Sequence, residues 1–203
     1  MEKRALVCGG ASGIGQAFAL ALANRGYHVT ITTRSKERAQ SLDDADYRNG
    51  RVTCIMMDCS KSELWENLQS KFDIYVISTG NLEYVSALEA GVDHYQRAFE
   101  AHLNPVIHLS NHLAQFCDED KADIYLLGSE LSHEAVPDCA PYVVAKHALL
   151  GLYRSLEEDI FHRPLIKLHF LEPPDVRTNL WPENVLATVP MISADEYVAT
   201  IDF

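Results

Sequence analysis

The chain has 203 residues, of which 47% are hydrophobic and 23% are charged, and its formal net charge is −12. This length suits one domain with its own core, so we expect residues 1–203 to form a single domain. The acidic balance argues against a nucleic acid or an anionic membrane as a partner, because binding either one requires a basic surface.

The sequence also bears on the compartment. No apolar run approaches the ~20 residues of a membrane span, and the first residues are too short a stretch for a signal peptide. Five cysteines without a Cys-x-x-Cys pair indicate reduced thiols: Cys8, Cys54, Cys59, Cys117 and Cys139. We therefore expect a cytoplasmic protein, in which Cys54 and Cys59 simply pack in the core and a loop.

A glycine-rich segment follows the first predicted strand, Arg4 to Cys8, and an apolar helical pattern continues from it as far as Gly26. A strand, a glycine turn and a helix together place free backbone N–H groups against a pyrophosphate. A flexible turn is the alternative, but the position of the segment favours nucleotide binding. The residues expected to bind are Gly9, Ser12, Gly13, Ile14 and Gly15.

The end of the second predicted strand, His28 to Thr33, bears on the choice of cofactor. In a dinucleotide fold an acidic residue there holds the ribose hydroxyls and selects NAD. Arg34 stands close to that place, with Lys36 and Arg38 behind it. Because Arg can grip a 2′-phosphate, we predict NADP(H) rather than NAD(H). The alternative is an ordinary charged start of a helix.

The rest of the chain alternates between strand and helix patterns. Further strands are predicted at Val52 to Met57, Asp73 to Ser78, Ala122 to Leu127 and Leu165 to Leu171. Predicted helices are one capped by Ser60 with Glu63, two within Tyr84 to Phe116 broken near Asn104-Pro105, one from Pro141 to about Phe161, and a short one after Ser193; a polar loop precedes the last. This alternation predicts an α/β fold with a doubly wound parallel sheet of about six strands, Rossmann-like.

Tyr142 and Lys146 are four residues apart on a predicted helix, so both side chains can face one pocket. A nearby ammonium would lower the pKa of the phenol from ~10 toward neutrality. Alone, this spacing favours an amphipathic helix with a buried Tyr and a Lys that reaches solvent, until other motifs in the chain agree.

In combination, these motifs resemble those of the short-chain dehydrogenase/reductase family, over almost the whole chain. Its Thr-Gly-x-x-x-Gly-x-Gly turn is matched with Cys8 in the Thr place, and its Tyr-x-x-x-Lys by Tyr142 and Lys146. Ser129 stands at the place of the family's catalytic Ser. Asp58 matches a residue that contacts adenine, and Thr178 follows Pro173-Pro174 as the family's Thr follows Pro-Gly.

The sequence departs from the family pattern at three places. Of the family's Asn-Asn-Ala-Gly only Gly80 is kept, and His102 aligns with the fourth catalytic residue, an Asn. Either His102 or Asn104 could hold the water that the Asn holds. The chain ends at Phe203, about where the family's seventh strand would begin, and a missing strand would leave a sheet edge that needs cover.

The resemblance implies an NADP(H)-dependent oxidoreductase acting on a small carbonyl or alcohol. It also implies that substrate specificity lies in the loop after the sixth strand, which is apolar near Leu180 and Trp181. Tyr142 would be the proton donor or acceptor, Ser129 would orient the substrate oxygen, and Lys146 would lower the Tyr142 pKa and bind ribose. Thr178 would contact the carboxamide or a phosphate. The resemblance also implies a homodimer or homotetramer.

Two alternatives remain open. His108 and His112, four apart on a predicted helix, invite a metal site, but no third ligand stands at a suitable spacing except Glu100, so we expect no metal. The altered Asn-Asn-Ala-Gly segment and His102 would also suit a weakly active or inactive NADPH-binding sensor of the same fold.

Overall fold

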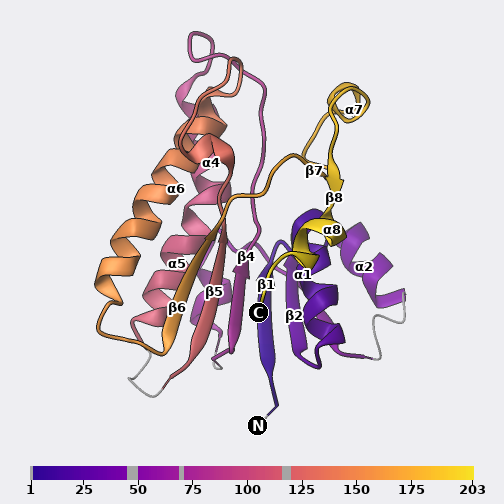
Figure 1. The fold of residues 1–203 in the computed structure, drawn as a ribbon, viewed down its shortest axis with the longest axis vertical. Coiled ribbons are helices and arrows are strands. Elements are labelled where there is room, and N and C mark those ends of the chain that lie inside the picture. Colours follow the sequence, from indigo (N-terminus) through magenta and orange to yellow (C-terminus); the bar gives the residue numbers. More distant parts are fainter. Residues whose placement is uncertain (1, 45–49, 69–70, 116–119) are drawn as a thin grey trace.

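The structure is a computed structural model that describes residues 2–44, 50–68, 71–115 and 120–203. Six parallel strands form its central sheet (Figure 1). In chain order they are β1 (Arg4–Cys8), β2 (His28–Thr33), β3 (Val52–Met56), β4 (Ile74–Ile77), β5 (Ala122–Leu127) and β6 (Ile166–Leu171), and across the sheet they run β3-β2-β1-β4-β5-β6. The predicted doubly wound, Rossmann-like sheet is confirmed.

Helices cover both faces of the sheet (Figure 1). On one face lie α1 (Gly13–Asn24) and α8 (Ala194–Ala199), and on the other lie α4 (Val92–His102), α5 (Asn104–Leu113) and α6 (Ala140–Asp159). Shorter helices are α2 (Lys36–Asp44), α3 (Ser62–Glu66), α7 (Glu183–Leu186) and the 3₁₀ turn η1 (Glu130–Ser132).

The core is divided by the pleat of the strands. Val7 and Val76 point toward α1, whereas their neighbours Leu6 and Tyr75 point toward α5. Successive side chains of a strand face opposite sides, so strands buried on both faces read as continuous apolar runs. This is why β1 and β4 could be recognised from the sequence although neither alternates between apolar and polar residues.

Several predicted boundaries are wrong. The residues from Tyr84 to Gly91 are not helical, and α4 begins only at Val92. Ser60 does not cap a helix: its N–H donates to Asp58 Oδ1 (2.9 Å), and Lys61 is the N-cap of α3. The two-helix break at Asn104-Pro105 is confirmed, since α4 ends at His102 and α5 begins at Asn104.

The polar loop predicted after β6 holds structure of its own. Two short strands, β7 (Val176–Arg177) and β8 (Ile192–Ser193), pair in parallel and bracket α7. Ser193 caps α8 as predicted, because its Oγ accepts from Glu196 N (3.1 Å). In the sheet, β6 is the edge strand, and no strand of the described chain lies beyond it.

The order of the strands places the site. The chain builds β1, β2 and β3 outward in one direction and then crosses back to β4 on the other side of β1. In open parallel sheets the crevice outside the carboxyl ends of the strands, at this reversal, is where ligands bind. Here Cys8 ends β1 and Ile77 ends β4, so the glycine turn and the Ser78–Gly80 segment border this crevice.

Candidate active site

The glycine turn between β1 and α1 has a backbone that only glycine adopts without strain. Gly9 has φ +76° and Gly13 has φ +55°. A Cβ on Gly15 would lie 2.5 Å from Gly9 O, and one on Gly9 would lie 3.0 Å from Ser78 O. The turn is therefore packed to backbone contact, and side chains are excluded from the surface that it presents to the crevice.

The N-terminus of α1 presents backbone donors at this turn. The N-cap residue Ser12 makes no side-chain cap bond; instead its Oγ accepts from Arg38 Nη1 at 2.9 Å. The first N–H groups of a helix have no partner within it and attract anions. Gly9 N–H is turned inward and donates to Thr32 Oγ1 (3.2 Å).

Two adjoining cavities open beside the turn, of about 250 Å³ and about 220 Å³. Because they share wall residues, we treat them as one cleft with a first and a second cavity. The shared residues are Gly9, Ser12, Arg38, Ser78, Thr79 and Gly80.

The first cavity lies over β2 and β3 and carries the predicted adenosine-side residues. Arg34 and Asp58 both line it, with Arg34 Nη1 3.9 Å from Asp58 Oδ2. The Arg34 side chain is 67% exposed, so solvent weakens this ion pair. Arg38 lines both cavities, which the sequence did not indicate.

The second cavity brings together Tyr142, Lys146, His102 and Thr178. Tyr142 and Lys146 lie one turn apart on α6, both buried, and Lys146 is only 4% exposed. Its Nζ donates to Leu127 O at 2.7 Å and lies 5.5 Å from the centre of the Tyr142 ring. The alternative of a lysine that reaches solvent is therefore wrong.

Ser129 comes to Tyr142 from the segment after β5. It is the N-cap of η1, where its Oγ accepts from Leu131 N at 3.2 Å, and its hydroxyl is near enough to Tyr142 to act on the pKa of that phenol. The structure thus gathers the three predicted catalytic side chains at one end of the cleft.

The electrostatics of this group differ from the prediction. Burial raises the pKa of Tyr142, and the hydrogen bond from Ser129 only partly opposes it. Burial also lowers the pKa of Lys146 to about 7, so at neutral pH its amine is only partly charged. The expected lowering of the Tyr142 pKa by Lys146 is therefore wrong for the protein by itself, because burial outweighs the attraction.

His102 forms the back wall of the second cavity. Its ring meets that of Tyr142 edge-on with centroids 5.3 Å apart, and its Nε2 lies 2.9 Å from Asn81 O. Burial lowers the pKa of His102 to about 3, with Lys146 adding to the effect, so the imidazole is neutral. Its buried Nδ1 has no hydrogen-bond partner. Asn104, the other candidate, lines neither cavity.

Gly80 and Thr178 fit tightly against other site residues. A Cβ on Gly80 would lie 2.5 Å from His102 Cε1, which explains why glycine stands there. A Cβ on Gly13 would lie 3.1 Å from Thr178 Cγ2, so Thr178 covers the glycine turn.

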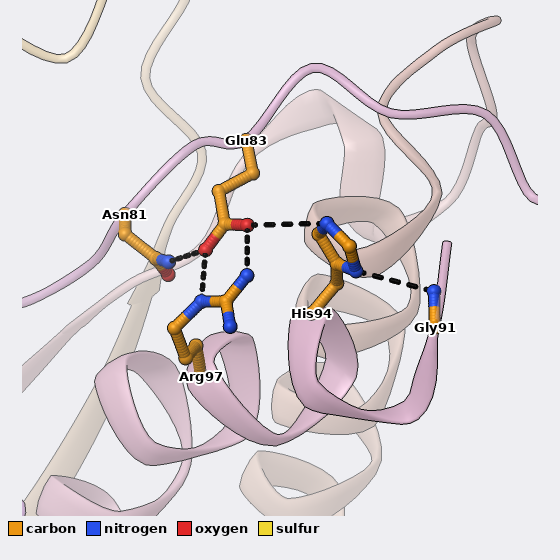
Figure 2. A network of polar contacts seen from close by, with 5 residues as sticks. All are labelled: Asn81, Glu83, Gly91, His94 and Arg97. Atoms are coloured by element: carbon orange, nitrogen blue, oxygen red, sulfur yellow. Dashed lines mark hydrogen bonds and ion pairs between the residues drawn. The ribbon is translucent and has the colours of Figure 1, made fainter. Parts of the chain in front are cut away.

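A polar network that the sequence did not indicate fixes the segment after Gly80 (Figure 2). Arg97 on α4 donates to both carboxylate oxygens of Glu83, at 2.8 and 2.7 Å, and Asn81 Nδ2 donates to Glu83 at 3.1 Å. His94 Nε2 lies 4.0 Å from Glu83, and its Nδ1 accepts from Gly91 N. The network holds Asn81, and with it the backbone that His102 contacts.

The histidines considered as metal ligands have other partners. His108 Nε2 lies 3.3 Å from Ser60 O, and His112 Nε2 lies 3.1 Å from the Tyr75 hydroxyl. Within the described ranges no group of three or more His, Cys, Asp or Glu side chains is arranged to hold a metal ion. In the same part of the chain, every helix is too short or too polar to cross a bilayer.

Comparisons with known proteins identify the family of the chain. The family model described as short chain dehydrogenase matches residues 3–187. A hydroxynaphthalene reductase-like protein Arp2 of Metarhizium brunneum is 30% identical over 198 residues, covering 93% of this chain and 73% of the relative. The uncharacterized oxidoreductase YusZ of Bacillus subtilis is 25% identical, covering 96% and 72%.

Solved structures share the fold. A 4-hydroxyisoleucine dehydrogenase complexed with NADH superposes with a TM-score of 0.85 at 21% identity, over 98% of this chain and 89% of that one. ElxO with NADP bound gives 0.81 at 20% identity, over 92% and 79%. The chain belongs to the short-chain dehydrogenase/reductase family, and it is an oxidoreductase.

Proposed function

We propose that this protein is an NADP(H)-dependent oxidoreductase that interconverts a carbonyl and an alcohol on a small, partly apolar substrate. The observation that carries the proposal is that Ser129, which follows β5, lies near Tyr142 and Lys146 of α6, and that Tyr142 and Lys146 share a cavity with the glycine turn. A phenol and an alcohol that lie close together can both reach one substrate oxygen.

The cleft fits a dinucleotide. Gly9 lines both cavities, and Gly13 and Ile14 at the N-terminus of α1 line the second, so backbone N–H groups border the space that a pyrophosphate would occupy. Gly9, Ser12, Gly13, Ile14 and Gly15 would hold the phosphates, Asp58 the adenine, and Gly80, Lys146 and Thr178 the nicotinamide half. When bound, the cofactor would supply or accept the hydride.

The side chains have separate roles in this proposal. Tyr142 gives a proton to the substrate oxygen or takes it back, and Ser129 orients that oxygen by a hydrogen bond. Lys146 binds the ribose of the cofactor, and His102, neutral at any ordinary pH, keeps the wall behind Tyr142 in place.

Tyr142→Phe tests the reaction. With NADPH and a panel of small aldehydes and ketones, we expect the variant to lose turnover by about 10²–10⁴-fold while binding NADPH within about twofold of the parent. Tyr153→Phe is the matched control, since Tyr153 lies on the same helix but bonds Glu157 outside the cleft. Full turnover in Tyr142→Phe would refute the role of the phenol.

The preference for NADP(H) is supported by two arginines. Arg34 and Arg38 both line the first cavity, and Arg38 already contacts Ser12 at the glycine turn. A guanidinium can bind a phosphate with two parallel hydrogen bonds. We expect Arg34→Ala and Arg38→Ala each to weaken NADPH binding about tenfold and NADH binding little, with the exposed Arg154→Ala as control. Equal losses for both nucleotides would refute the preference.

The sensor remains a second candidate because of one observation: the pKa of Tyr142 is raised, not lowered. A phenol with a raised pKa is a weaker acid and stays protonated at neutral pH. Tight NADPH binding without turnover of any carbonyl or alcohol in the panel would favour the sensor.

We further propose that the protein acts in the cytoplasm as a homodimer or homotetramer. Exposed apolar side chains on α4 and α6, Phe99 and Val144, support an interface there. Sedimentation of the purified protein at micromolar concentration tests this, and a monomer would refute it.

A further inference from the structure

The His102 ring is in contact with both the Gly80 backbone and the ring of Tyr142. A Cβ on Gly80 would lie 2.5 Å from His102 Cε1, and the rings of His102 and Tyr142 meet edge-on with centroids 5.3 Å apart. His102 is 2% exposed and Tyr142 is 8% exposed, so neither ring has free space to move into. A shift of the backbone at Gly80 therefore displaces His102 and, through it, Tyr142.

The peptide group of the next residue, Asn81, determines which nitrogen of His102 carries the proton. His102 Nε2 lies 2.9 Å from Asn81 O and 3.2 Å from Asn81 N. It can donate to the carbonyl or accept from the N–H, but one ring nitrogen cannot do both at once. The shorter contact places the proton on Nε2, which leaves Nδ1 as an acceptor. A small displacement of the Asn81 peptide would favour the opposite tautomer.

Glu83 holds the side chain of Asn81 (Figure 2). Asn81 Nδ2 donates to Glu83 Oε1 at 3.1 Å, whereas Asn81 Oδ1 is buried and has no hydrogen-bond partner among the described residues. Glu83 is itself fixed by Arg97 of α4, which donates to both of its carboxylate oxygens. Within the described part of the chain, the placement of the Asn81 side chain therefore depends on its bond to Glu83.

We propose that Glu83 is a positioning residue for the proposed reaction, acting through Asn81 on His102. It fixes the place and the tautomer of the imidazole and, through the imidazole, the position of the Tyr142 ring. Glu83 lines neither cavity of the cleft, so it acts only through the side chains that do. The effect on turnover rests on the proposed function, whereas the effect on the His102 ring does not.

The expected effect is on turnover rather than on cofactor binding. Tyr142 must lie within hydrogen-bond reach of the substrate oxygen to transfer a proton, and a misplacement of ~1 Å can cost up to about 10²-fold in rate. The glycine turn that would hold the pyrophosphate belongs to another segment, between β1 and α1. NADPH binding should therefore change little when the bond between Glu83 and Asn81 is broken.

Glu83→Ala and Asn81→Ala test this link, alone and together, in steady-state kinetics with NADPH and the carbonyl that the parent reduces fastest. We expect each single variant to lower kcat about tenfold, while KM for NADPH stays within about twofold of the parent value. Because both changes break the same hydrogen bond, the double variant should also lose about tenfold, and not about a hundredfold. Glu89→Ala is the matched control, since Glu89 is an exposed glutamate of the same segment that bonds Ser86, and it should keep the parent kcat.

A second measurement needs no turnover. In NMR spectra of protein with isotope-labelled histidine and tyrosine, the shifts of the two ring nitrogens of His102 report its tautomer. The parent should show the proton on Nε2, whereas Glu83→Ala and Asn81→Ala should show a mixture of tautomers together with a changed ring signal of Tyr142. Glu89→Ala should give the parent spectrum. A merely structural loss of stability would not change the tautomer in the folded state.

Three results would overturn the proposal: a parent kcat in Glu83→Ala, a loss in the double variant equal to the product of the single losses, or identical His102 ring spectra in the parent and Glu83→Ala. Circular dichroism shows whether each variant is folded, and Glu83→Gln, which keeps the size of the side chain, replaces Glu83→Ala if that variant is not. If the parent reduces no carbonyl of the panel, the proposed function fails, and the ring spectra still decide whether Glu83 positions His102.

Discussion

Replacing Lys146 by Met tests the most unusual electrostatic feature of the site. Lys146 is 4% exposed, its Nζ donates to Leu127 O, and burial lowers its pKa to about 7 from an ordinary value of 10.5. In the unfolded chain the amine keeps its ordinary pKa. Between pH 7 and pH 10.5 the unfolded state therefore binds more protons than the folded state, and stability rises with pH.

The size of the effect follows from the two pKa values. From pH 7 to pH 9, this one amine should raise the free energy of unfolding by about 2 kcal/mol. Lys146→Met removes the titrating group with little change in volume, so its stability relative to the parent should fall by the same amount across this range. The tyrosines and cysteines are the same in both proteins, so their contributions to the pH dependence cancel in the difference.

Urea unfolding of both proteins at half-unit intervals of pH, in the absence of cofactor, measures this difference. Lys121→Met is the control, since Lys121 is exposed and its loss should leave the pH dependence unchanged. If the parent and Lys146→Met show parallel curves from pH 7 to pH 9, Lys146 is not the buried, partly neutral amine described above, and its proposed role beside Tyr142 has no basis.

Three further predictions follow from particular contacts. Gly15→Ala places a Cβ 2.5 Å from Gly9 O, so we expect at least tenfold weaker NADPH binding by fluorescence titration, whereas Gly151→Ala, with open space around it, should bind normally; equal binding would contradict the packing. The Cε1 proton shift of His102 should stay constant from pH 8 to pH 5 by NMR, because its pKa is about 3, and a titration near pH 6.5 would show that His102 is not buried. Arg97→Gln removes both bonds to Glu83 and, because the pair is solvent-exposed, should lower stability to urea only slightly. It should raise hydrogen exchange at Asn81 more than at Ser129, and no change at Asn81 would exclude the network as its support.

The sequence alone predicted the sheet and most of the site. Strands buried on both faces read as apolar runs, and the glycine turn, Ser129 and the Tyr142 to Lys146 spacing are local patterns or fixed separations along the chain. Such features need no knowledge of distant contacts, because backbone sterics and helix periodicity determine them. The helix predicted over Tyr84 to Gly91 is wrong, because α4 begins only at Val92, where the Gly91 N–H donates to His94 Nδ1.

Only the tertiary structure decided the electrostatics and the hidden partners. The sequence predicted that Lys146 lowers the pKa of Tyr142, but desolvation dominates, and burial depends on everything packed around α6. Arg38 reaches Ser12 across 26 residues, and Cys59, which follows β3, lies 2.7 Å from Thr32 on β2. Contacts between segments so far apart arise from the strand order, which no local pattern encodes.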